Sequence, residues 1–249
     1  MLETKRYQDL TIYYRANSAD ERVLDHSFER DIFYPELFDF QEQERMFIID
    51  VGAHIGTFSI LSSLKYRSSR IISIEPNPES YSILDRNIRS NQLTNIYPIE
   101  AALNSQAGPV MLYLSTENWE HSITEQFDGS HLEVKGVTLQ QIFLDYQVQT
   151  CDLIKMNCEG AEFNIILNLS EDILSKIKMI LILYHEDLVN HGLNHKTLVS
   201  YLVKKGFTVR KSQMRKQRGW LIAKNTRFYR VAFIDGIFNK FRSSLKRKK

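Results

Sequence analysis

The sequence of 249 residues contains only two cysteines, Cys151 and Cys158, and no apolar run near the roughly 18 residues that span a bilayer. The two cysteines flank one predicted strand, which would hold them roughly 20 Å apart, too far for a mutual disulfide. The N-terminal stretch lacks the apolar core of a signal peptide. These absences predict a cytoplasmic protein with free thiols.

Acidic residues are almost missing from the last fifth of the chain. Residues 201–249 hold 16 Lys and Arg against one acid, Asp235, whereas residues 1–200 hold 16 against 29. The net charge of +2 therefore conceals an acidic body and a basic end. This charge is compatible with a merely solvated tail. It is equally compatible with binding to an anionic membrane surface, or to a phosphate-bearing acceptor such as a nucleotide sugar, a lipid-linked glycan or RNA.

The remaining composition, with 43% hydrophobic and 25% charged residues, is typical of one globular domain with short additions. From Met46 on, apolar strands alternate with helical segments, which predicts a parallel sheet with helices on both faces. The fold class is therefore α/β, a Rossmann-like single domain. We divide the chain into three parts: a lead-in that caps the site (1–45, with a helix over 31–40), the domain itself (46–225) and the basic tail (226–249).

Seven strands are expected in this domain, with a β excursion, carried by VMLYLS and HLEVKGVTL, before the fourth. The strands cover residues 46–51, 70–75, 96–101, 152–157, 178–184, 207–211 and 220–223. One helix is expected directly after Gly56, and three more cover residues 78–91, 160–169 and 196–205.

The most informative segment is MFIIDVGAHIGTF, residues 46–58. A strand ends at Asp50, Gly52 and Gly56 turn the chain into a helix, and the next strand ends in Glu75, which is the layout of a βαβ unit that binds a nucleoside. The glycines allow the backbone to come close to a ligand. A carboxylate at Glu75 can accept hydrogen bonds from both hydroxyls of a ribose and repels a 2′-phosphate.

The loop spacing distinguishes between nucleosides. It reads D-x-G-x-x-x-G, without Lys or Arg, rather than the G-x-G-x-x-G of pyrophosphate sites. With Asp50 facing the ligand, such a loop suits a positively charged molecule, and S-adenosylmethionine carries a sulfonium and an α-ammonium. The alternative for Asp50 is a helix cap.

Five segments in register resemble the FkbM family of S-adenosylmethionine-dependent methyltransferases over roughly residues 47–223: FIIDVGAHIGTF, ISIEPNPESYSILDRNIRSNQL, AALN, CDLIKMNCEGAEFNIILNL and ILILYHED. The resemblance implies a seven-stranded methyltransferase sheet with an antiparallel last strand. It also implies O-methylation of a hydroxyl on a sugar, glycan precursor or natural product. The residues expected to bind the cofactor are Asp50, Gly52, Ala53, His54, Gly56, Glu75, Pro76, Asn77, Ala101 and Asn157.

Two residues depart from the family pattern. His54 stands where the family usually has Asn, and it can replace a hydrogen bond to the methionine part of the cofactor or simply fill the space. Asn157 stands where the family usually has Asp, and an amide cannot take a proton at neutral pH. If the family's Asp serves as a base or metal ligand, this chain must use another group.

Methyl transfer to a hydroxyl requires that its oxygen be placed in line with the S-methyl bond and that its proton be removed. The candidates at the ends of the fourth and fifth strands are Asn157, Glu159 and His185, and His121 in the WEHSIT loop is a further one. His185 is the first choice as general base because its ordinary pKa lies near working pH; the alternative is a structural histidine. Glu159 and Glu162 begin a helix, where at least one is expected to act as a cap.

A divalent metal is compatible with the sequence but not expected, because no tight ligand motif is present. The donors that a hard cation could use are Asn157, Glu159, His185 and Asp187. His191 and His195, spaced i and i+4, would make a zinc pair on a helix, but Gly192 between them favours a loop.

Two other functions are compatible with the sequence. An RNA methyltransferase could use the basic end, but neither an appended RNA-binding module nor an N-P-P-Y-like amine site occurs, so nucleic acid is not an expected partner. A noncatalytic binding protein could retain the cofactor fold, but catalytic decay would first damage Asp50 or Glu75, and both are present. The expected partners are a hydroxyl-bearing small molecule or glycan and, through the tail, an anionic membrane surface that would hold the protein peripherally.

Overall fold

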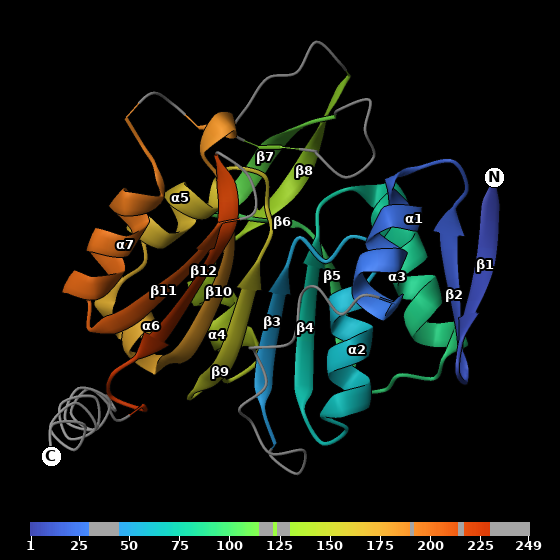
Figure 1. Ribbon diagram of the computed structural model, residues 1–249, viewed down its shortest axis with the longest axis horizontal. Helices are drawn as coiled ribbons and strands as arrows, with labels where there is room; N and C mark the ends of the chain where they lie inside the picture. Colours follow the sequence, from blue (N-terminus) through green and yellow to red (C-terminus); the bar gives the residue numbers. More distant parts are fainter. Residues whose placement is uncertain (30–44, 115–121, 124–129, 190–191, 214–216, 230–249) are drawn as a thin grey trace, which may run out of the picture.

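The computed structural model describes residues 1–29, 45–114, 122–123, 130–189, 192–213 and 217–229 (Figure 1). The predicted helix over residues 31–40, His121 and the predicted tail from residue 230 on lie outside these ranges. Both cysteines are free, as predicted. Among the described helices, none combines the length and the apolar character needed to cross a bilayer.

A seven-stranded sheet organises the molecule, with the strand order β11-β12-β10-β9-β3-β4-β5 (Figure 1). β12 is antiparallel to both of its neighbours, and the other six strands run parallel. The predicted α/β fold and antiparallel last strand are therefore confirmed. The strands are β3 (Phe47–Val51), β4 (Arg70–Glu75), β5 (Ile96–Glu100), β9 (Cys151–Met156), β10 (Ile177–His185), β11 (Phe207–Gln213) and β12 (Arg218–Asn225).

The central strands are buried along their whole length because both faces of the sheet are covered. Every residue of β3 and β9 is buried. Since successive side chains of a strand point to opposite faces, neighbouring residues enter different cores. Ile48 belongs to the core on one face and Ile49 to the core on the other.

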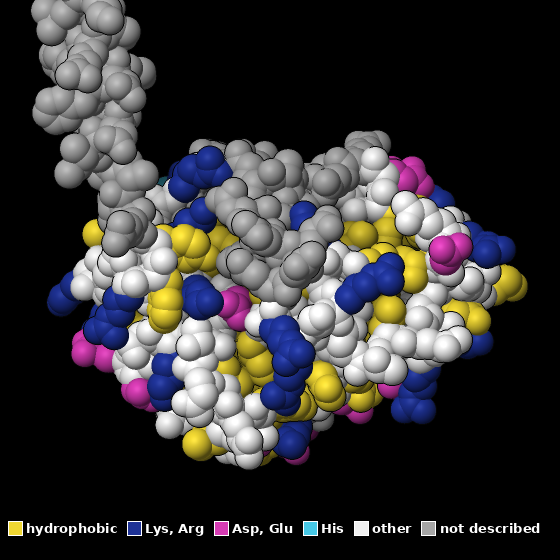
Figure 2. Space-filling view, turned by 90° about the horizontal axis from the view of Figure 1, so that it is seen from below, with side chains coloured by type: hydrophobic (Ala, Val, Ile, Leu, Met, Phe, Trp, Pro, Cys, Tyr) yellow, Lys and Arg dark blue, Asp and Glu magenta, His cyan; other side chains and the backbone are white. Residues whose placement is uncertain are grey.

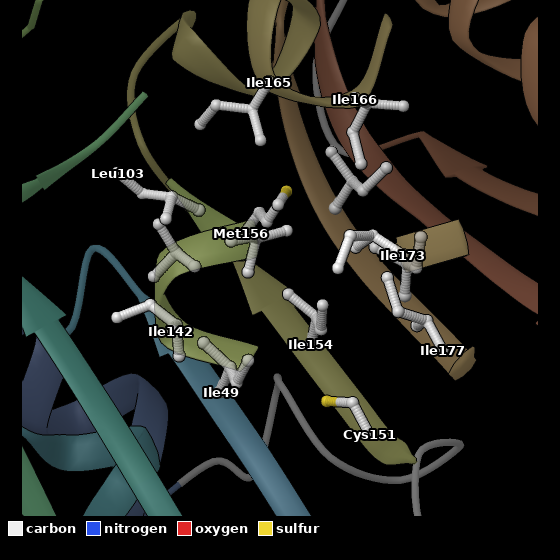
Figure 3. Packing of buried hydrophobic residues seen from close by; sticks show 14 of the residues in the cluster. Ile49, Leu103, Ile142, Cys151, Ile154, Met156, Ile165, Ile166, Ile173 and Ile177 are labelled. Carbon is white, nitrogen blue, oxygen red and sulfur yellow. The ribbon is translucent and has the colours of Figure 1, made fainter. Parts of the chain in front are cut away.

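Helices form the two outer layers. α2 (Thr57–Lys65) and α3 (Pro78–Ser90) pack on the face of Ile48. The predicted start of α3 is confirmed, because the Asn77 side chain accepts from the N–H groups of Glu79 and Ser80. The other face carries α4 (Leu139–Asp145), α5 (Ala161–Leu167), α6 (Glu171–Lys176) and α7 (His195–Lys204). Figure 3 shows part of this second core, where side chains of β3 and β9 meet those of α4, α5 and α6.

The predicted β excursion forms a separate three-stranded sheet near the carboxyl edge of the main sheet (Figure 1). Its order is β6-β8-β7, with β7 and β8 antiparallel. The strands are β6 (Ala102–Leu103), β7 (Gly108–Tyr113) and β8 (His131–Val137), and a short 3-10 helix η2 (Glu186–Leu188) follows β10.

An N-terminal hairpin was not predicted. The first residues form β1 (Leu2–Tyr7), β2 (Leu10–Arg15), α1 (Ala19–Leu24) and the π-helical turn η1 (Asp25–Glu29). Asn87 of α3 holds the hairpin: its Oδ1 accepts the Tyr13 N–H at 2.7 Å and its Nδ2 donates to the Tyr13 carbonyl at 3.1 Å. A contact between residues so far apart in sequence leaves no periodic pattern from which it could be predicted.

At the opposite edge of the sheet, where the parallel strands begin, Arg70 lies over three aromatic rings. Its guanidinium is 5.5 to 5.8 Å from the ring centroids of Phe47, Tyr97 and Tyr146. Figure 2 views the molecule from this side and shows Lys and Arg side chains spread among apolar and polar patches. The cation–π contacts connect β3, β4 and β5 to the end of α4.

Candidate active site

A cleft of about 210 Å³ lies at the carboxyl edge of the parallel strands, where open α/β sheets bind ligands. The loop after β3, the ends of β4, β9 and β10, and parts of β12, α1 and η1 line it. Eight residues predicted for the site contribute to this lining: Gly52, Ala53, His54, Glu75, Pro76, Asn157, Glu159 and His185. Four predicted cofactor residues lie outside the lining: Asp50, Gly56, Asn77 and Ala101.

Glu75, at the end of β4, is a buried carboxylate held by two backbone amides. Its Oε2 accepts the N–H of His54 at 2.7 Å, and its Oε1 accepts the N–H of Asn77 at 2.9 Å. Burial raises the pKa of this carboxyl, and the two amides and nearby positive groups oppose the rise. Each oxygen keeps a further lone pair for a donor in the cleft, which suits a pair of ribose hydroxyls.

The loop after β3 can lie against β9 only because residue 52 is a glycine. Its φ is +70°, and a Cβ at Gly52 would stand 1.8 Å from the carbonyl oxygen of Asn157. A Cβ at Gly56, with φ +93°, would stand 2.5 Å from Cδ1 of Leu84 in α3. At both positions, close packing within the protein itself therefore requires a glycine.

Asp50 does not have the surroundings that the sequence predicted. Its side chain is fully buried, and Lys155 Nζ donates to its Oδ1 at 2.9 Å while Ser59 Oγ donates to its Oδ2 at 2.7 Å. The register of β3 and β9 places Asp50 beside Lys155, which corrects the expectation of a loop without a nearby cation. The negative charge of Asp50 is therefore neutralised inside the protein and is not available to balance a ligand.

The N-terminal hairpin brings a second charged cluster to the loop after β3. Arg15 and Asp20 form a bidentate ion pair, with Nε–Oδ2 at 3.0 Å and Nη2–Oδ1 at 2.9 Å. His54 Nε2 lies 3.0 Å from Oδ1 of Asp20. Burial raises the pKa of the Asp20 carboxyl, but hydrogen bonds from His54 and Arg15 outweigh burial and hold this pKa well below its usual range. The cluster ties the lead-in to residue 54.

His185, at the end of β10, lies between two carboxylates. Its Nδ1 is 3.1 Å from Oε1 of Glu162, and its Nε2 is 3.3 Å from Oε2 of Glu159. Burial lowers the pKa of the ring, but the two carboxylates outweigh burial and raise the pKa above its ordinary value. The structure therefore stabilises an imidazolium. The sequence made His185 the first choice as general base, but a protonated ring has no lone pair left to accept a proton.

Glu159 is held by its backbone as well as by its charge. Its φ is +48°, a left-handed conformation, and Ser122 Oγ donates to its carbonyl oxygen at 2.7 Å. Arg218 Nη1 lies 4.0 Å from Oε2 of Glu159, and Arg218 Nη2 lies 2.8 Å from Oδ2 of Asp187. The charges of five neighbouring side chains therefore alternate in sign, starting from the fully buried Glu162: Glu162, His185, Glu159, Arg218 and Asp187.

The predicted helix-capping role is confirmed for Glu162. Its Oε2 accepts the N–H of Gly160, the N-cap residue of α5, at 2.9 Å. The other oxygen accepts the backbone N–H of His185 at 2.8 Å. One buried carboxylate therefore fixes both the start of α5 and the end of β10.

The candidate metal ligands have other partners. Asp187 pairs with Arg218, and His195 begins α7 with its Nδ1 against Glu186, while His191 lies outside the described residues. Within the part of the chain that the structure describes, no three His, Cys, Asp or Glu side chains are grouped to hold a metal ion.

Sequence reasoning missed Lys155, Arg15 and Asp20. Lys155 had a detectable signal, since it is a charged residue inside an otherwise apolar central strand, where a lysine requires a buried partner. Arg15 and Asp20 had none, because only the docking of the hairpin brings them to His54.

Comparison with known proteins identifies the family. Residues 50–209, more than half of the chain, match the Methyltransferase FkbM domain. Methyltransferase sdnD of Sordaria araneosa is 24% identical over 197 residues, which cover 66% of this chain and 74% of that protein. Methyltransferase 1 of Beauveria bassiana is 22% identical over 223 residues, which cover 81% of this chain and 87% of that protein.

Solved structures agree on the fold. The crystal structure of methyltransferase FkbM from Methylobacillus flagellatus KT matches with a TM-score of 0.54 and 17% identity, covering 77% of this chain. The match covers 46% of that chain, so this protein spans less than half of its length. The fibrillarin pre-rRNA processing protein of Methanococcus jannaschii matches with a TM-score of 0.51 and 12% identity, covering 90% of this chain and 82% of that one. The chain belongs to the FkbM family of S-adenosylmethionine-dependent methyltransferases.

Proposed function

We propose that the cleft binds S-adenosylmethionine and that the enzyme O-methylates a hydroxyl of a sugar, a glycan precursor or a natural product. Glu75 supports the binding step, because its two oxygens are fixed by backbone amides and line the cleft. In this proposal they accept the ribose hydroxyls. The bound cofactor would supply an electrophilic methyl group on a sulfonium.

Glu159 and His185 supply the groups that a hydroxyl acceptor needs. An ordinary hydroxyl is a poor nucleophile until a base takes its proton. Because His185 is stabilised as an imidazolium by Glu162 and Glu159, we propose that the Glu159 carboxylate is the base that takes the proton of the acceptor hydroxyl. His185 then keeps that carboxylate in place and stays charged.

The observation that carries this assignment is the row Glu162–His185–Glu159, in which His185 and Glu159 line the cleft and the fully buried Glu162 lies behind them. The neighbouring walls are apolar, with Val23, Leu183 and Trp220 in the lining. Apolar walls around a few polar groups are typical of sites for small organic molecules. These walls would pack against the carbon skeleton of the acceptor while Glu159 accepts a hydrogen bond from its hydroxyl.

The binding step is tested by calorimetry with S-adenosylhomocysteine, the demethylated product. Glu75→Ala removes two charge-assisted hydrogen bonds worth about 1.5 to 3 kcal/mol each, so the affinity should fall at least about tenfold. Glu79→Ala is the control, because Glu79 is also acidic and lies near the end of β4 but has an exposed side chain. Unchanged affinity in a folded Glu75→Ala variant would remove the assignment.

The chemical step is tested by mass spectrometry of hydroxylated acceptors with labelled S-adenosylmethionine. On an acceptor found in this way, Glu159→Gln should lower turnover by about 10²- to 10⁴-fold, as for a lost general base, with the affinity for S-adenosylhomocysteine nearly intact. Transfer of label to nitrogen, or full turnover by Glu159→Gln, contradicts the proposal. A chelator added to the same assay tests for a metal requirement.

A further inference from the structure

Two buried acceptor atoms in the cleft have neither a hydrogen-bond partner nor an ion-pair partner among the described residues. They are Nδ1 of His54, on the loop after β3, and Oδ1 of Asn157, just after β9. The two segments are in contact, because Gly52 packs directly against the carbonyl of Asn157. Leaving a buried polar atom unpaired costs about 1 to 3 kcal/mol, so two such atoms in one cleft indicate a ligand that supplies donors.

The hydrogen bonds around His54 determine which of its nitrogens carries the proton. Nη2 of Arg15 has two hydrogens, and they go to Oδ1 of Asp20 at 2.9 Å and to Oγ of Ser80 at 3.0 Å. Nη2 therefore has no hydrogen left for Nε2 of His54, 3.1 Å away. Nε2 must instead donate to Oδ1 of Asp20, at 3.0 Å. In the neutral ring this leaves Nδ1 as an acceptor.

The charges near the loop agree with a positively charged ligand group. Lys155 is neutralised by Asp50, so that the lysine does not repel a cation. The same ion pair removes Asp50 as a counter-charge. A ligand cation therefore has to find its acceptors elsewhere in the cleft.

We propose that Nδ1 of His54 and Oδ1 of Asn157 accept hydrogen bonds from the α-ammonium of the cofactor, and that Asp20 is a positioning residue that fixes the tautomer of His54. This inference rests on the proposed function, since it needs S-adenosylmethionine in the cleft. It gives the N-terminal hairpin a part in cofactor recognition, because Arg15 and Asp20 come from that hairpin and the helix after it.

The test is calorimetric binding of four ligands that differ only in the amino-acid part: S-adenosylhomocysteine, its analogue without the α-amine, its analogue without the α-carboxylate, and methylthioadenosine, which lacks both groups. His54→Leu and Asn157→Leu should each weaken binding of S-adenosylhomocysteine about 10- to 100-fold. The same loss should appear with the analogue that retains the amine. The affinities for methylthioadenosine and for the amine-free analogue should not change, which also shows that the variants are folded.

Two further variants separate positioning from simple packing. His54→Asn keeps an acceptor on the side chain and should restore most of the lost affinity. Asp20→Asn lets an amide N–H donate to Nε2 of His54, which moves the ring proton to Nδ1 and should weaken S-adenosylhomocysteine binding. In the His54→Asn background, Asp20→Asn should have no further effect on ligand selectivity.

Three outcomes overturn the inference. If His54→Leu weakens all four ligands equally, its effect is structural. If the loss follows the α-carboxylate instead of the α-amine, Nδ1 acts as a donor. If Asp20→Asn weakens binding equally with and without His54, Asp20 does not act through the ring. A parent enzyme that binds neither S-adenosylhomocysteine nor methylthioadenosine would instead refute the proposed function, and this assignment with it.

Discussion

The ammonium of Lys155 lies 2.9 Å from Oδ1 of Asp50, across two neighbouring strands whose paired residues are 105 positions apart in the chain. The same ammonium donates to the carbonyl of Gly52 at 2.8 Å. Strands β3 and β9 and the loop after β3 are thus joined at one buried charge pair.

Breaking this pair from either side should be costly. Lys155→Met leaves Asp50 buried without its cation, and Asp50→Asn leaves Lys155 without its anion, so each should lose about 3 to 5 kcal/mol of unfolding free energy. The double variant removes both charges and should be more stable than the sum of the single losses predicts. Urea denaturation of the four proteins measures this coupling, and strictly additive losses would contradict it.

Gly52→Ala should destabilise the protein by more than the roughly 1 to 3 kcal/mol that a left-handed backbone alone costs another residue. The added Cβ would collide with the carbonyl oxygen of Asn157, which is backbone and cannot turn away. Gly206→Ala is the matched control, since its φ is +87° and its nearest atom, Oγ1 of Thr226, would stand 3.7 Å from the new Cβ. Equal losses in chemical denaturation would show that the backbone angle alone matters.

The stability of the enzyme should depend on pH through His185. The pKa of this ring is raised in the folded state above the ordinary value of about 6.5. The stability it contributes is therefore fully present below about pH 6.5 and is lost as pH rises through the raised pKa. His185→Gln should reduce the fall of unfolding free energy over this range. Parallel pH profiles for the parent and the variant, measured by urea denaturation, would contradict the charge state assigned to the ring.

Asn87→Leu should release the N-terminal hairpin from α3. The Asn87 amide is fully buried, and besides its bonds to Tyr13 it donates to the carbonyl of Ile55 in the loop after β3 at 2.9 Å. We expect hydrogen exchange to rise at Tyr13 and around Ile55 while β9 stays protected. Asn168→Leu, which removes an exposed amide at the end of α5, serves as the control. Unchanged exchange in the hairpin would show that other contacts hold it.

The sequence predicted the main sheet well because its signals are local. Strand β4 and the start of α3 agree with the prediction to the residue, since an apolar run followed by Asn-Pro at a helix start is readable within a short window. The sequence did not show which residues pair with Asp50 and His54, because Lys155 and Asp20 come from other parts of the chain; the lysine within β9 indicated only that it needs a buried partner. The charge state of His185 was missed for the same reason: Glu162 is 23 residues away in the sequence and reaches the ring only in the fold.

The position of β12 sets the order in which this enzyme can be completed during synthesis. Leu183 of β10 pairs with Trp220 of β12, and His185 pairs with Arg218, so one wall of the cleft comes from the last strand of the sheet. Until residues 218–225 have left the ribosome, β10 keeps an unpaired edge, and such edges invite pairing with other chains. Among the described strands β11 pairs only with β12, so its place in the sheet also depends on the strand that is synthesised after it.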